Sequence, residues 1–113
     1  MKVNLKNKVA LVTGSGKGIG RAIAETFTEN GAHVAYTDVD KTLFKDNSPK
    51  AGDYSVYELD VRNDNHIEEV IASILREHGR IDILINNAGG GDLNYRVSGD
   101  RVTIESWSRV IEM

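Results

Sequence analysis

The sequence contains no cysteine, only one proline, and few aromatic residues, which make up 6% of its 113 residues. Without cysteine, disulfide bonds and thiolate metal sites are excluded. Basic residues are not in excess, because 14 Lys and Arg stand against 17 Asp and Glu, so nothing indicates a nucleic acid or an anionic membrane as a partner. No secretion leader is recognisable, and no run of 18 apolar residues could cross a bilayer. We therefore expect a cytoplasmic protein.

The composition that remains is typical of a folded domain. Hydrophobic residues make up 40% of the chain and charged residues 27%, which separates it from disordered sequences. A chain of this length is long enough for one modest domain with its own core.

Glycine is concentrated directly after a short apolar run, residues 9–13. The sequence there reads Thr13-Gly14-Ser15-Gly16-Lys17-Gly18-Ile19-Gly20, and an amphipathic helix pattern begins inside it. Glycines let the backbone approach an anion closely and adopt positive φ. The N-terminus of the following helix adds unpaired N–H groups and the positive end of its dipole. The motif predicts a phosphate-binding loop, with a simple tight turn as the alternative.

The glycine spacing separates this loop from two better-known motifs. The strict G-x-G-x-x-G pattern fails, since Ile19 and Arg21 stand where a third glycine is required. The G-x-x-x-x-G-K-[ST] pattern fails because Gly18 follows Lys17. The spacing that fits is Gly14-x-x-x-Gly18-x-Gly20.

Strand and helix patterns alternate along the chain. Strands are predicted over residues 9–13, 33–38, 54–61 and 81–85, and helices from Gly18 to Asn30-Gly31 and from Asn63-Asp64 to His78-Gly79. The apolar stripes of the two helices are Ile19, Ala22, Ile23 and Phe27, and Ile67, Val70, Ile71, Ile74 and Leu75. Residues 39–53 are predicted to form a loop with a short helix, 89–102 a polar loop, and 103–113 the start of a helix. This order predicts an α/β fold with a parallel sheet and helices on both faces.

Polar residues at the ends of the predicted strands indicate a ligand site. In such sheets ligands bind where the strand order reverses, so the glycine loop and residues 86–89 should face one crevice. Asp38 ends the second strand, where a carboxylate binds adenosine ribose hydroxyls and repels a 2′-phosphate, which favours NAD over NADP. Lys17 in the glycine loop favours the opposite choice. A loop or cap role is the alternative for Asp38.

Two further polar segments follow the third and fourth strands. The Asp60 carboxylate could accept the adenine amino group while Val61 packs on the ring, and a strand-end turn is the alternative. The amides of Asn86-Asn87 could hold backbone near the ligand, and Ala88-Gly89 would let it approach; a turn is again the alternative. His33, His66 and His78 lie on different predicted elements without metal-ligand spacing, so we predict structural or solvated roles and no metal site.

A catalytic arrangement is not recognisable in the 113 residues. No G-x-S-x-G or H-E-x-x-H motif occurs. None of the four tyrosines has a lysine four positions later, where it would help to lower the tyrosine pKa for proton transfer. We therefore predict no catalytic residue in this chain.

Together these motifs resemble the N-terminal half of a short-chain dehydrogenase/reductase. The resemblance rests on Thr13-Gly14-x-x-x-Gly18-Ile19-Gly20, Asp38, Asp60-Val61 and Asn86-Asn87-Ala88-Gly89, in the family's order and spacing. It covers nearly the whole chain. It implies a Rossmann-type doubly wound parallel sheet, truncated after about four strands, and hydride transfer between NAD(P) and a ketone or secondary alcohol.

The resemblance also assigns roles to residues. The cofactor-binding positions are Gly14, Ser15, Lys17, Gly18, Ile19, Gly20, Asp38, Val39, Asp60, Val61, Asn87, Ala88 and Gly89. The family's Ser, Tyr-x-x-x-Lys pair and Asn find no match here, so we expect the cofactor half of a longer, oligomeric enzyme that is inactive without the rest. A non-catalytic nucleotide-binding module and an interaction protein that lends its open sheet edge are the alternatives.

Overall fold

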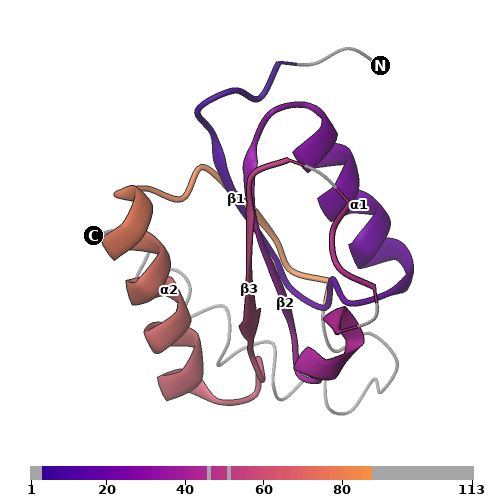
Figure 1. Ribbon diagram of the computed structural model, residues 1–113. Helices are drawn as coiled ribbons and strands as arrows, with labels where there is room; N and C mark the ends of the chain where they lie inside the picture. The colour runs from indigo at the N-terminus through magenta and orange to yellow at the C-terminus, as the bar shows by residue number, and fades with distance from the viewer. Residues whose placement is uncertain (1–3, 46, 51, 88–113) are drawn as a thin grey trace.

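A computed structural model describes residues 4–45, 47–50 and 52–87. Four strands form one parallel sheet in the order β3-β2-β1-β4. The elements are β1 (Val9–Val12), α1 (Gly18–Glu29), β2 (His33–Asp38), the 3₁₀ helix η1 (Lys41–Phe44), β3 (Tyr54–Glu58), α2 (Asp64–His78) and β4 (Ile83–Ile85). The helices α1 and α2 cover opposite faces of the sheet (Figure 1). The predicted α/β architecture is therefore confirmed.

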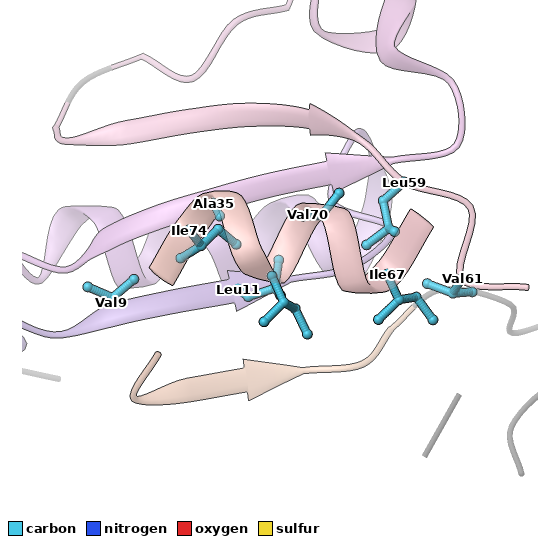
Figure 2. Packing of buried hydrophobic residues seen from close by; sticks show 9 residues of the cluster. Val9, Leu11, Ala35, Leu59, Val61, Ile67, Val70 and Ile74 are labelled. Atoms are coloured by element: carbon cyan, nitrogen blue, oxygen red, sulfur yellow. The ribbon is translucent and has the colours of Figure 1, made fainter. Parts of the chain in front are cut away.

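The alternation of side chains along β1 builds two cores, one on each face. Val9 and Leu11 pack under α2, whereas Ala10 and Val12 pack on the α1 side. Figure 2 shows the α2 side, where side chains of α2 lie against those of β1 and β2. Burial on both faces explains why this strand has a continuous apolar sequence.

The structure agrees with the predicted helix ends. Asn63 caps α2 by accepting a hydrogen bond from the His66 N–H at 3.1 Å. Gly79 ends α2 in the left-handed region with φ 78°, and Gly31, with φ 101°, follows the C-cap of α1. These signals are local, so the sequence carries them directly.

Two predicted strands are shorter in the structure. β3 ends at Glu58 and not at residue 61, because β2, its only partner among the described strands, ends at Asp38, which is paired with Glu58. β4 begins at Ile83 and not at residue 81, where its ladder with Ala10 on β1 starts. For β3 the neighbouring strand sets the limit.

The apolar stripe predicted for α1 matches its buried face only in part, since Phe27 packs against the core but the residues near the start of the helix do not. Ile19 is 74% exposed and Ala22 is exposed as well. The buried residues of α1 are Gly20, Arg21, Ala24 and Thr28. Tyr36 on β2 explains this choice, because the Thr28 hydroxyl bonds its OH at 2.8 Å and the Arg21 guanidinium lies 5.7 Å from its ring centroid. Ile19 is thereby left facing outward at the start of the helix.

Two histidines that the sequence separates lie together at the amino end of the sheet. The ring centroids of His33 and His78 are 3.9 Å apart. Asp53 Oδ1 lies 2.9 Å from Nδ1 of His33, and the side chain of His33 is 10% exposed. This pair lies at the end of β2 opposite to Asp38.

Candidate functional site: the carboxyl edge of the sheet

The glycine loop occupies the carboxyl end of β1, next to β4, where the strand order reverses. β1 pairs with β2 on one side and with β4 on the other, although β4 is farthest from it in sequence. Loop and helix start lie at the same end of the sheet as η1 (Figure 1). Ligands of open α/β sheets bind outside the carboxyl ends of strands at such a reversal.

The backbone of the loop uses glycine where glycine is required. Gly14 and Gly18 have φ of 61° and 65°. A Cβ on Gly20 would lie 2.3 Å from the Gly14 carbonyl oxygen and 2.5 Å from Nδ2 of Asn87. The tight packing at Gly20 and the left-handed turns at Gly14 and Gly18 together form the compact loop.

The N-terminus of α1 has no capping side chain. Its N-cap residue is Lys17, which makes no side-chain cap hydrogen bond, and the first turn has no acidic residue. In contrast, α2 has Asn63 as its cap and Asp64 in its first turn. Helix N-termini attract anions through free N–H groups and the helix dipole. The uncapped start of α1 can therefore accept an anionic group.

Thr13 joins this loop to the end of β4. Its Oγ1 lies 3.1 Å from Oδ1 of Asn86 and accepts a hydrogen bond from the Asn87 N–H at 2.9 Å. The Asn87 side-chain amide donates to the Gly14 carbonyl at 3.2 Å. The structure thus brings together the loop and the Asn86-Asn87 turn, as predicted. The predicted positions Ala88 and Gly89, and the predicted elements after them, lie outside the described residues.

The side chain of Ser15 lies inside the glycine loop. It is fully buried, and its Oγ lies 2.9 Å from the Val12 carbonyl and accepts from the Thr37 N–H at 2.8 Å. The Ser15 N–H donates to the Thr37 carbonyl at 2.7 Å. Its side chain therefore ties β1 to β2 and does not face outward, which the motif alone did not indicate.

Asp38 lies at the end of β2, directly beside the loop. Its Oδ2 accepts a hydrogen bond from the Gly16 N–H at 3.0 Å, and its Oδ1 accepts from the Asp40 N–H at 3.3 Å. The next residue, Val39, is 58% exposed, and Lys17 is exposed as well. Asp38 is thus a carboxylate held at a fixed position against the glycine loop.

Asp60 already has a cationic partner. Its carboxylate receives two hydrogen bonds from the Arg62 guanidinium, each of 3.0 Å, and this partner lowers the pKa of Asp60. The Asp60 N–H donates to Nδ1 of His66 at 3.2 Å, which gives that histidine a structural role. The neighbouring Val61 is buried in the α2 core. Asp60 remains ionised and fixed, with Arg62 as a partner that the motif did not indicate.

Some contacts important for the site carried no signal in the sequence. Thr13 was part of the glycine motif, but its hydrogen bonds to the Asn86-Asn87 turn were not indicated, and Leu43 was visible only as part of a loop. Leu43 lies in η1, and a Cβ on Gly16 would be 2.7 Å from its Cδ1. Contacts of this kind join segments distant in sequence, so no local pattern encodes them.

Other features of the described residues indicate no competing site. A hollow of about 540 Å³ lies between η1 and β3, and Phe44, Pro49, Tyr54 and Val56 contribute to its lining. None of the sequence-predicted site residues lines it. Within residues 4–45, 47–50 and 52–87, no group of three or more His, Asp or Glu could hold a metal ion. The helices in that same part of the chain are too short or too polar to span a bilayer.

The sheet order and the loop at its carboxyl edge define a Rossmann-type fold. Comparison with known families gives the narrower class, since residues 8–113 match the family model described as short chain dehydrogenase. The chain belongs to the short chain dehydrogenase family.

Individual relatives agree with this assignment. The chain is 41% identical over 111 residues to 3-oxoacyl-[acyl-carrier-protein] reductase FabG of Vibrio cholerae, covering 97% of this chain and 44% of that protein. It is 38% identical to sorbitol dehydrogenase of Cereibacter sphaeroides, covering 96% and 41%. The structure of the Pseudomonas aeruginosa RhlG/NADP active-site complex superposes with a TM-score of 0.78 at 25% identity, covering 96% and 46%. The chain therefore spans less than half the length of these relatives.

Proposed function

We propose that this chain forms the cofactor-binding half of an NAD(P)-dependent oxidoreductase. The parent reaction would be reversible hydride transfer between the nicotinamide and a small ketone or secondary alcohol, of the 3-oxoacyl or sugar and polyol type. The single observation that carries the proposal is the uncapped N-terminus of α1, which follows the left-handed Gly14 and begins at the left-handed Gly18, at the strand-order reversal. The helix N-terminus offers free N–H groups and the positive end of the helix dipole. A diphosphate supplies the acceptor oxygens and the negative charge that such a position binds.

We assign a position to each part of the cofactor, and of the residues named for it only Ala88 and Gly89 lie outside the described part of the chain. The diphosphate would lie against residues 14–20, with the exposed Ile19 beside it. Asp38 would bind the ribose hydroxyls, Asp60 and Val61 would border the adenine, and residues 87–89 the middle of the cofactor. Ser15 would shape the loop from inside. The nicotinamide supplies the hydride chemistry, and the chain's own groups bind and orient it.

Asp38 favours NAD as the cofactor. A 2′-phosphate brought within about 4 Å of its carboxylate would meet a repulsion of roughly 4 kcal/mol at an effective dielectric constant near 20. Lys17 is a cation in the same loop, but its exposure weakens the attraction that it could offer to that phosphate. We therefore propose NAD as the preferred cofactor and NADP as the weaker one.

Calorimetric titration of the complete gene product with NADH and NADPH tests this proposal. We expect NADH to bind, and Asp38→Ala to weaken NADH binding while leaving the fold intact by circular dichroism. A ketone panel with 3-oxoacyl thioesters and ketoses then tests hydride transfer by loss of NADH absorbance. Failure of both dinucleotides to bind would contradict the proposal. A cytoplasmic location and a dimeric or tetrameric assembly belong to the same proposal, and light scattering tests the assembly.

A further inference from the structure

Leu43 lies against the glycine loop at the position where Asp38 also contacts it. A Cβ built on Gly16 would lie 2.7 Å from Cδ1 and 3.0 Å from Cβ of Leu43, and 2.8 Å from Oδ2 of Asp38. The three residues come from the loop, from η1 and from the end of β2. An apolar side chain and a carboxylate therefore cover the same face of one glycine.

The position of Leu43 is fixed by hydrogen bonds of its own helix. Asp40 caps η1 by accepting from the Thr42 N–H at 3.0 Å and from the Thr42 hydroxyl. The Leu43 N–H donates to the Asp40 carbonyl at 3.1 Å. Asp40 in turn donates its own N–H to Asp38. A short chain of hydrogen bonds thus links the carboxylate at the end of β2 to the turn that carries Leu43.

The next residue anchors η1 to the sheet. Phe44 is 5% exposed and packs in the core on the α1 side. Its ring meets that of Tyr36 edge to face, with centroids 6.2 Å apart. Since η1 is held by this ring on one side and by the Asp40 cap on the other, Leu43 cannot move away from Gly16 without cost.

We propose that Leu43 is a specificity-determining residue that excludes a 2′-phosphate from the adenosine end of the cofactor. This inference rests on the proposed function, which places the ribose at Asp38. A 2′-phosphate carries nearly two negative charges and needs donors or cations around its oxygens. The Leu43 side chain has no donor, and it occupies the space next to Gly16 where such groups would have to stand. It acts by shape and desolvation, independently of the charge on Asp38.

The experiment isolates the adenosine end by using 5′-ADP and 2′,5′-ADP as calorimetric probes on the complete gene product. The measured quantity is the ratio of the Kd of 2′,5′-ADP to that of 5′-ADP. We expect Leu43→Ala to lower this ratio about tenfold, as for other changes of a few methylenes in a binding site. Leu43→Val should lower it less, and Leu43→Ile, which keeps the volume, should leave it near the wild-type value.

Val56→Ala serves as the matched control. Val56 lies on β3 and lines the hollow on the other side of η1, so its truncation removes similar apolar volume away from Gly16. The ratio of the Kd of 2′,5′-ADP to that of 5′-ADP should be the same in Val56→Ala as in the wild type. If Leu43→Ala does not fold, the smaller decrease in the Kd ratio expected for Leu43→Val provides the test.

The outcomes separate this inference from the proposed function. If 5′-ADP binds but folded Leu43→Ala and Leu43→Val keep the wild-type ratio, the role of Leu43 is refuted and the proposed function stands. A wild-type protein that binds 2′,5′-ADP at least as well as 5′-ADP refutes the role of Leu43 directly. If 5′-ADP does not bind at all, the proposed function fails, and the role of Leu43 fails with it.

Discussion

At the scale of single residues, two glycines offer a matched comparison. Gly18 and Gly79 have φ of 65° and 78°, and a Cβ at either would meet no heavy atom within 4 Å. Replacement by alanine should therefore cost each site about 1 kcal/mol of unfolding free energy through backbone strain alone. Only Gly18 lies in the glycine loop. We expect Gly18→Ala to weaken NADH binding and Gly79→Ala to leave it unchanged.

Urea unfolding and calorimetric titration of both variants check this comparison. Equal losses of stability with a selective loss of NADH affinity in Gly18→Ala support a cofactor role for the loop. Equal NADH affinity in the two variants would assign Gly18 a purely conformational role.

At the scale of elements, the two helices differ in how their N-termini are satisfied. Lys17 has the extended backbone of an N-cap residue, with φ −158° and ψ 170°, but no capping side chain. Lys17→Asp should supply the missing acceptor and a favourable charge at the helix dipole, adding about 0.5–1 kcal/mol of unfolding free energy. The same carboxylate would occupy the N–H groups proposed for the diphosphate. We expect higher thermal stability together with much weaker 5′-ADP binding.

The cap of α2 provides the opposite case. Asn63→Ala removes the acceptor for the His66 N–H and should lower the unfolding free energy by about 1 kcal/mol. Because α2 starts with its own cap and Asp64, we expect no change in the Kd of 5′-ADP. Thermal melts and the same titration measure both effects. A comparable loss of 5′-ADP affinity in this variant would show that the effect of Lys17→Asp is not specific to α1.

The elements also show which features a sequence can predict. Both α-helices begin and end near the predicted residues, because Asn63, Gly31 and Gly79 act through hydrogen bonds and backbone angles within a few residues. Strand ends were predicted less well, since β3 stops where β2 stops pairing with it. The buried face of α1 was predicted only in part for a related reason: Tyr36, on another element, contacts Thr28 and Arg21, which the apolar stripe did not include.

The candidate site also combines features that the sequence predicts with features that it does not. The glycine positions and Asp38 were predicted, because a phosphate loop and a strand-end carboxylate have a fixed spacing along the chain. Ser15 was predicted as a position of the cofactor loop, but no pattern indicated that its hydroxyl bonds between β1 and β2. The contact of Leu43 with Gly16 bridges 27 positions by way of η1, a path that no periodic pattern records.

At the scale of the whole molecule, Asp82 links the start of β4 to the start of β1. Its Oδ2 accepts from the Val9 N–H at 2.8 Å, and its carboxylate is paired with the Arg80 guanidinium. The Arg80 hydrogen bonds, followed by the one from Val9, hold the pKa of Asp82 below its ordinary value. A carboxyl whose folded pKa is lowered stabilises the fold above its unfolded pKa, about 3.9, and loses this effect as the pH falls through the folded value.

Asp82→Asn keeps an acceptor for Val9 but removes the charge. We expect the variant to be less stable than the wild type at neutral pH, and the difference between them to shrink below about pH 4. Urea unfolding of both proteins from pH 7 to pH 3 measures this difference in unfolding free energy. Asp60, which is similarly paired, titrates in both proteins, so its contribution cancels in the difference. A difference that stays constant over this range would contradict the electrostatic origin of the link.

The sheet edge at β4 gives the last prediction. Within the described residues β4 pairs with β1 on one side only, and Ile83, Leu84 and Ile85 are half-buried. Unpaired backbone beside apolar side chains promotes association. A polypeptide of these 113 residues alone should therefore bind a hydrophobic dye, form aggregates of no single size in sedimentation, and show no NADH turnover with ketones. The complete gene product should bind little dye, sediment as the discrete dimer or tetramer proposed above, and turn over NADH. A dye-negative monomer of the 113 residues would mean that β4 is covered within this chain, and turnover by it would place the catalytic groups there too.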